Sequence, residues 1–183
     1  MLDLDWMESV KARLKRKNQV LFSPKDDLLA PLALLLEGQD RRAVVLWALG
    51  LAEEAVERLE EKRPGEGRPR AALETCRLWA AGTVKMPQAK GAILACHALA
   101  REWDDPEGIA LCHAVGQGCS VVHTAGHAMG LPIYELTALV RRFGPDRCRE
   151  PVEARAQDYL DRLGYWQGHW RDWPGSWASF LCR

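Results

Sequence analysis

The residues from 112 to 130, CHAVGQGCSVVHTAGHAMG, gather side chains that bind metals, transfer protons or attack electrophiles. They include three of the chain's five histidines and two of its six cysteines. Imidazole and thiolate groups are ligands for zinc and other transition metals, and an imidazole beside a thiol can activate it as a nucleophile. Their placement on the backbone decides which of these roles is open.

The local sequence predicts that this stretch lies on one continuous helix over 105–130. Asp105 is a typical N-cap residue, and a proline follows it in the first turn. With about 100° of rotation per residue, Cys119, His123 and His127 fall on one face together with small glycines. Cys119 and His127 would lie roughly 12 Å apart along the axis. The three side chains therefore cannot meet at one tetrahedral centre.

His123 and His127 have the four-residue spacing at which two imidazoles of a helix hold zinc or another transition metal. A third ligand would come from another helix, with Cys96, His97 or Glu135 as candidates. One alternative is a polar ligand-binding cleft. The other is a pair of histidines that only form internal hydrogen bonds in a close helix contact, and the small residues nearby favour this interpretation.

Catalytic motifs are weak in this sequence. Cys119 and His123 could form a nucleophile pair at i and i+4, but no third residue is in place to orient the imidazole. Thr124 follows the first of the two histidines where a zinc metalloprotease needs Glu, and VGQGCS lacks the third glycine of a dinucleotide-binding loop. We therefore expect no catalytic residue and no resident cofactor, with zinc or another transition metal as the alternative.

Arg77 is a further candidate for a ligand-binding residue. Its stem can pack against apolar neighbours while its guanidinium pairs with an acid such as Glu74 or Glu135. The alternative is an anion site that Arg77 forms with His97 or His123. The candidate ligand-binding residues are therefore Arg77, His97, Cys119, His123 and His127.

Helical periodicity recurs along the chain between proline and glycine residues, and no segment alternates as a strand does. Ser23 and Pro24 predict the start of a segment that Pro31 breaks or kinks. The pattern predicts further helices over about 3–18, 41–62, 69–81, 87–103, 105–130, 132–143 and 151–170. The predicted fold is all-α, a compact single-domain bundle of about seven or eight helices with an irregular Trp-rich C-terminal tail. We divide the chain into an N-terminal helical segment packed on the body (1–37), a helical domain (38–172) and the tail (173–183).

Charge and composition narrow the range of partners. Lys plus Arg and Asp plus Glu both total 25 among 183 residues, so no net field attracts nucleic acid or an anionic membrane. No apolar run has the length of a signal peptide or a membrane span, and we expect a cytoplasmic protein. The six cysteines lie on apolar helical patterns, which predicts reduced thiols and no disulfide framework.

From about 41 to 170, the sequence resembles the Imm-5-like family of small bacterial immunity proteins. The segments that carry this resemblance are RRAVVLWALGLAEEAVE (41–57), GRPRAALETCRLWAAG (67–82), ILACHALARE (93–102), IALCHAVGQGCSVVHTAGHAMGLPIYELTALV (109–140) and EPVEARAQDYLDRLGYWQ (150–167). The residues that fit the family pattern are Arg42, Trp47, Arg68, Pro69, Arg77, Trp79, His97, His123 and His127. The resemblance implies an all-helical fold and a protein that neutralises the cognate toxin of a polymorphic toxin system by binding it.

Tryptophans are concentrated near the C-terminus, where three of the chain's eight lie in the last fourteen residues. Their rings are either buried where the tail wraps the body or presented as an aromatic contact surface. Because the chain has no net charge, tryptophans are the residues best suited to anchor an interface with a toxin. The candidate partner-binding residues are Trp166, Trp170, Trp173 and Trp177, and the same face could instead support a homo-oligomer.

Overall fold

The computed structural model describes residues 5–183 of the chain. This part contains eight α-helices and four short 3-10 helices, and no strand occurs there. The α-helices are α1 (Trp6–Lys15), α2 (Ala30–Leu36), α3 (Arg41–Lys62), α4 (Arg68–Ala80), α5 (Met86–Leu99), α6 (Pro106–Ser120), α7 (Gly130–Phe143) and α8 (Arg149–His169). The 3-10 helices are η1 (Ala100–Glu102), η2 (Ala125–His127), η3 (Trp170–Asp172) and η4 (Ser179–Cys182). The prediction of an all-α fold is confirmed. The first residues of the helix predicted over 3–18 lie outside the described part.

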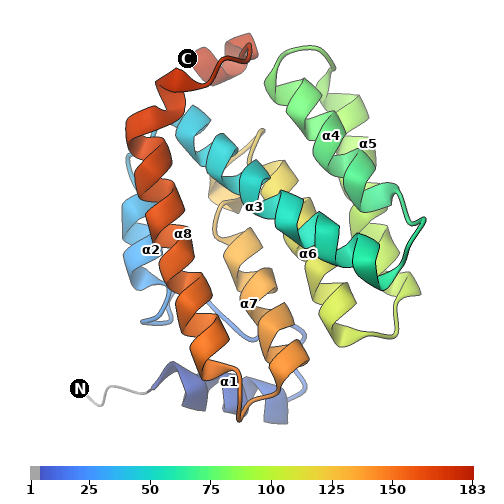
Figure 1. The fold of residues 1–183 in the computed structure, drawn as a ribbon, viewed down its shortest axis with the longest axis vertical. Coiled ribbons are helices and arrows are strands. Elements are labelled where there is room, and N and C mark those ends of the chain that lie inside the picture. The colour runs from blue at the N-terminus through green and yellow to red at the C-terminus, as the bar shows by residue number, and fades with distance from the viewer. Residues whose placement is uncertain (1–4) are drawn as a thin grey trace.

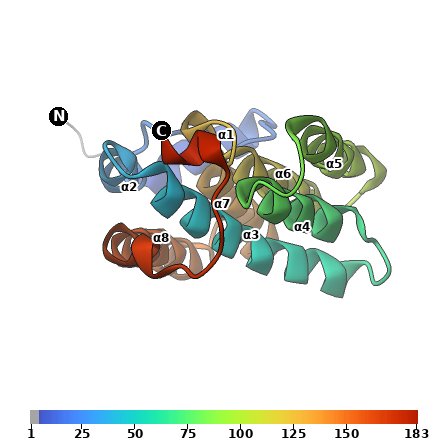
Figure 2. The same ribbon diagram turned by 90° about the horizontal axis from the view of Figure 1, so that it is seen from above.

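The longest helix, α3, organises the core. It runs diagonally between α8 on one side and the α4–α5 pair on the other, and it packs on α6 behind it (Figures 1 and 2). Twelve of its residues are buried, so apolar side chains surround most of the helix. Trp47 of α3 is buried, and its indole Nε1 donates a hydrogen bond to the Tyr159 carbonyl oxygen at 3.0 Å. This bond ties α3 to α8 without leaving the buried N–H unpaired.

Proline, glycine and Asp105 set several helix ends as predicted. The Asp105 carboxylate accepts hydrogen bonds from the first backbone N–H groups of α6, and Pro106 occupies the first turn. Gly82 and Gly144 follow α4 and α7 with φ values of 81° and 79°. A side chain in this left-handed region would be strained, so glycine ends both helices at low cost.

The predicted start of the second helical segment is wrong. Residues 24–29 form turns, and α2 begins at Ala30, so Ser23 does not cap it. Pro31 lies in the first turn of α2. The N–H that proline lacks would have no intrahelical partner in the first turn, so Pro31 fits there. It starts the helix, whereas we expected it to break or kink one.

The predicted continuous helix over 105–130 is wrong beyond Ser120. α6 ends there, and the N–H groups of Val121 and Val122 bond to carbonyls three residues back. The chain then turns through η2, and α7 begins at Gly130. This turn buries both valine side chains and lets α7 pack against α6 in the most extensive helix contact of residues 5–183. Burial of that apolar surface outweighs the local helical pattern.

All six cysteines are free thiols, five of them buried and Cys182 exposed. None of the helices described is both long enough and apolar enough to cross a membrane.

Candidate functional site

Two clefts contain most of the residues that the sequence singled out. We call them the tryptophan cleft, which includes Trp166, Trp173 and Trp177, and the histidine cleft, which includes His97, His123 and His127. The structure therefore groups the candidates differently from the sequence, because Arg77 lines the tryptophan cleft and Cys119 lines neither.

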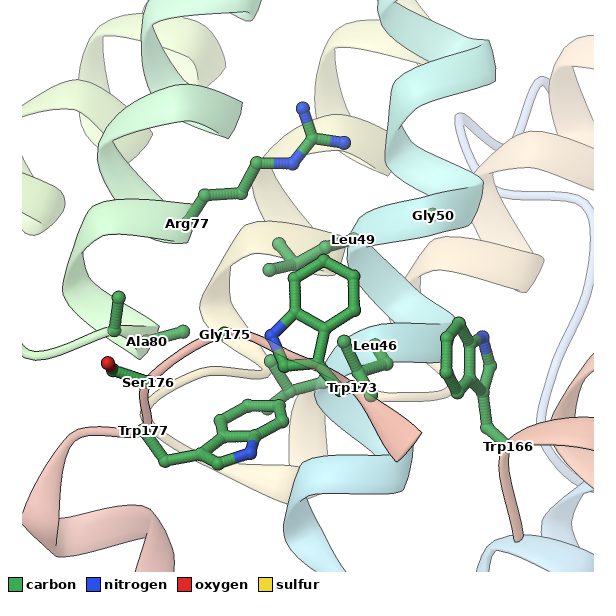
Figure 3. Close-up of a pocket in the computed structure, with 12 residues that line it drawn as sticks. Leu46, Leu49, Gly50, Arg77, Ala80, Trp166, Trp173, Gly175, Ser176 and Trp177 are labelled. Carbon is green, nitrogen blue, oxygen red and sulfur yellow. The ribbon is translucent and has the colours of Figure 1, made fainter. Parts of the chain in front are cut away.

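The tryptophan cleft has a volume of about 240 Å³ and lies where the C-terminal segment crosses α3 and α4 (Figure 3). Leu46 and Leu49 of α3 provide its apolar wall. Trp173 projects into the middle of the cleft, with Trp166 on one side and Trp177 on the other. The Trp173 side chain is 44% exposed, so water reaches a large apolar ring at this position.

A backbone contact holds the C-terminal segment on the body. The N–H of Ala178 donates to the Ala80 carbonyl at the end of α4, with a distance of 2.7 Å. Gly82 allows this approach, because a Cβ at that residue would lie only 3.3 Å from the Ala178 Cα. The segment that carries Trp173 and Trp177 is thus fixed against α4.

The remaining tail tryptophan, Trp170, does not line the cleft. Its ring is buried, and the Arg42 guanidinium lies 3.8 Å from the ring centre. This cation–π contact places Trp170 in the packing of the body. Sequence analysis did not single out Tyr165, an exposed ring on the same end of α8 that packs edge-on against Trp166. Tyr165 could have been identified from the sequence, because it directly precedes Trp166, one of the candidate partner-binding residues.

Arg77 forms an ion pair, but its partner is not one of those expected. The guanidinium lies 2.6 Å from a carboxylate oxygen of Glu53 on α3, so the pairing with Glu74 or Glu135 is wrong. Burial raises the pKa of Glu53, but hydrogen bonds from Arg70 and Arg77 outweigh it and hold the pKa below its usual value. The carboxylate therefore stays charged and fixes Arg77 at the edge of the tryptophan cleft.

The histidine cleft has a volume of about 410 Å³ and lies between α5 and the turn that joins α6 to α7. Both His123 and His127 are exposed. Because α6 ends at Ser120, before either residue, the two histidines do not share one helix face as predicted. The His123 ring stacks on Trp79 at 5.7 Å with an interplanar angle of 18°. His127 Nδ1 donates to Gln117 Oε1 at 3.0 Å. Different contacts therefore position the two imidazoles.

His97 also pairs with His113 of α6, a histidine that was not among the candidate site residues. Their Nδ1 atoms lie 2.8 Å apart, so one ring donates its proton and the other accepts it. Burial lowers the pKa of both imidazoles, and the positive charge of His113 and of His127 when protonated lowers that of His97 further. A neutral pair is the stable form of this contact.

A short sequence repeat could have indicated this pair. The dipeptide CH occurs at Cys96-His97 on α5 and again at Cys112-His113 on α6. The two helices pack together, and the Cys96 thiol donates to the Cys112 carbonyl oxygen at 3.4 Å while the histidines bond to each other. Each copy of the repeat therefore lies on the face of its helix that contacts the other helix.

Cys119 is fully buried, whereas His123 faces outward beyond the end of α6. A hydrogen bond with Cys76 and complete burial raise the pKa of the Cys119 thiol well above its usual value. The Cys119 and His123 nucleophile pair is therefore not formed. Among residues 5–183, no group of three or more His, Cys, Asp or Glu side chains is arranged to hold a metal ion. The helical spacing that the zinc interpretation required is absent.

A family model described as Imm-5 like putative immunity protein matches residues 34–162, well over half of the chain. The chain belongs to this immunity protein family. The match extends from α2 into α8 and includes Arg77 and every residue of the histidine cleft. Trp166, Trp173 and Trp177 lie beyond the matched segment. Searches of curated proteins and of solved structures found no match.

Proposed function

We propose that this immunity protein neutralises a toxin by binding it, with the tryptophan cleft at the centre of the contact surface. The observation that carries the proposal is Trp173, a half-exposed indole over an apolar cleft. Arg77 at the edge and Tyr165 nearby complete a set of Trp, Tyr and Arg, the residue types that dominate binding energy at protein interfaces. Family membership supports the general role in immunity.

The cleft is suited to an apolar side chain of the partner. Such a side chain would enter between Leu49 and Trp173 and would remove both from water. Arg77 would contribute a hydrogen-bond donor at the rim, where its pairing with Glu53 already restricts its motion. Because the net charge of the chain is zero, apolar contact and not long-range steering supplies the affinity. Neutralisation then follows from covering the toxin surface and requires no chemical step.

The test measures, by titration calorimetry, binding to a candidate toxic domain chosen from the genes next to that of this protein. We expect Trp173→Ala to weaken binding about 30-fold, as the loss of a central aromatic anchor does. Leu34→Ala is the matched control, because Leu34 is 70% exposed on α2 and does not line the cleft. Equal affinity of the two variants would contradict the choice of surface, and failure of the wild-type protein to bind the domain would contradict the proposed function.

Light scattering of the protein alone separates this proposal from self-association. We expect a monomer whose mass does not change in Trp173→Ala. A wild-type dimer that this substitution converts to a monomer would instead assign the tryptophan cleft to a homo-oligomer.

A further inference from the structure

The histidine cleft carries a local excess of basic groups. Its titratable side chains are Lys90, His97, His123 and His127, and no Asp or Glu lines it. The chain as a whole has equal numbers of acidic residues and of lysines plus arginines, and nine of its eighteen arginines are paired with carboxylates in the described part. Lys90 carries the permanent positive charge of the cleft, His123 and His127 add charge when they are protonated, and the absence of an acid in the lining favours an anion over a cation.

An adjoining hollow extends this basic region. It shares Trp79, Met86 and His123 with the histidine cleft, and its one additional charged residue is Arg41. The Arg41 guanidinium donates to the backbone carbonyls of Phe180 and His123, so neutral acceptors leave its charge uncompensated. The positive potential of the cleft thus continues past His123.

Several donors in the cleft are left unused by the protein. Lys90 Nζ and the ring nitrogens of His123 form no hydrogen bond to any other residue in the described part of the chain, and neither does His127 Nε2. His127 is nevertheless held in place, because its Nδ1 donates to Gln117. These groups are available to a ligand that accepts hydrogen bonds and carries negative charge.

Apart from Gln117 and Ser120 of α6, the rest of the lining is apolar, and half of the lining residues come from α5. Ile93 and Leu94 lie three and four residues after Lys90, and His97 lies four and three residues after them, so α5 presents the four on the same side. Leu94 is 56% exposed, and Met86 adds a further apolar side chain to the wall. A mostly apolar cleft with a few convergent polar groups is the usual composition of a small-molecule site.

Size also distinguishes the two clefts. The histidine cleft, at about 410 Å³, lies within the usual range of roughly 300–1,000 Å³ for small-molecule sites, whereas the tryptophan cleft, at about 240 Å³, lies below it. We propose that the histidine cleft binds a small organic anion, with an apolar body against Ile93 and Leu94 and a carboxylate or phosphate group held by Lys90, His123 and His127. This binding is independent of the proposed toxin contact and is measured on the protein alone.

The experiment follows the histidine ring signals of the tag-free protein by NMR while a probe is added. The probes are 4-phenylbutyrate, phenyl phosphate and the neutral 4-phenylbutanol. We expect at least one anion to shift the signals of His123 and His127 in a saturable manner below about 10 mM, with about ten-fold higher affinity than the alcohol. His169 is the internal control, because it lies on α8 outside the cleft. Comparison of the two anions identifies the preferred head group.

Two variants test the role of the charge. Lys90 is exposed, so Lys90→Gln should fold normally, and we expect it to weaken anion binding about five-fold or more. Lys25→Gln, an exposed lysine that does not line the cleft, should bind as the wild-type protein does. The proposal is overturned if neither anion saturates, if 4-phenylbutanol binds as tightly, if His169 shifts together with the cleft histidines, or if Lys90→Gln leaves affinity unchanged.

Discussion

Gly116 is the point at which α6 comes closest to the His97 imidazole on α5. A Cβ at this position would lie 2.3 Å from His97 Nε2 and 2.5 Å from its Cε1. The ring cannot move away freely, because its Nδ1 is 2.8 Å from His113 Nδ1 and the side chain is half-buried. We therefore predict that Gly116→Ala displaces His97 and breaks the bond between the imidazoles.

The expected magnitude combines two losses and one gain in the free energy of unfolding. Forcing a methyl group into a filled contact costs about 1–3 kcal/mol. Losing the hydrogen bond between His97 and His113 costs about 1 kcal/mol. Alanine is about 1 kcal/mol better than glycine in a helix interior, which offsets part of this. The balance is a loss of about 2 kcal/mol, which lowers the melting temperature of a protein of this size by about 4–8 °C.

Urea denaturation followed by far-UV circular dichroism measures this loss. Gly91→Ala is the matched control, because Gly91 lies within α5 and a Cβ there would meet nothing within 4 Å. We expect Gly91→Ala to be more stable than the wild-type protein by up to about 1 kcal/mol. Combining Gly116→Ala with His97→Ala should cost less than the two single losses together, because the second substitution removes the obstruction. A Gly116→Ala variant as stable as Gly91→Ala would refute the reasoning.

Three further predictions follow from buried polar groups. Glu135→Ala should lower the free energy of unfolding by about 2–3 kcal/mol in urea denaturation, because the buried Tyr159 hydroxyl loses its acceptor and Arg155, which keeps Glu54 and Asp158, loses its most buried carboxylate partner; a loss under about 1 kcal/mol would contradict this. The lowered pKa values of His97 and His113 mean that the folded protein binds fewer protons than the unfolded chain, so their contribution to stability is complete above about pH 6.5 and is lost as pH falls below it; a urea midpoint constant between pH 7 and pH 5 would count against this. A thiol reagent should label Cys182 alone of the six cysteines in the native protein and all six in denaturant, and rapid native labelling of a second thiol would contradict the burial of the others.

Much of the fold could be predicted because its signals are local. Helical periodicity, the Asp105 cap and the glycines at 82 and 144 depend on neighbouring residues only. The end of α6 at Ser120 could not be predicted in the same way. Val121 and Val122 fit the preceding helical pattern, and the chain turns there because α7 packs along α6, a contact between segments that the pattern does not relate.

The contacts among the candidate residues could not be predicted from positions along one helix. Side chains were assigned to each other from positions on one supposed helix, so Cys119 was joined to His123 although one is in the core and the other outside it. Arg77 was expected to pair with an acid such as Glu74 or Glu135, or else to form an anion site with a histidine, yet it pairs with Glu53 of α3. Pairs such as His97 and His113 depend on how α5 meets α6, and a single helical wheel contains no such information.

The two clefts lie differently with respect to residues 34–162, the segment that the family model matches, and the two proposals differ accordingly. Every residue of the histidine cleft lies within 34–162, whereas Trp166, Trp173 and Trp177 lie after this segment. The helical body that defines the family therefore contains the proposed anion site complete, but it supplies only the α3 and α4 walls of the proposed toxin contact. If both proposals hold, residues of the shared body hold the small anion, and recognition of a particular toxin depends on the C-terminal segment that Ala178 fastens to α4. A substitution in the segment would then change partner affinity without affecting anion binding, and Lys90→Gln would do the reverse.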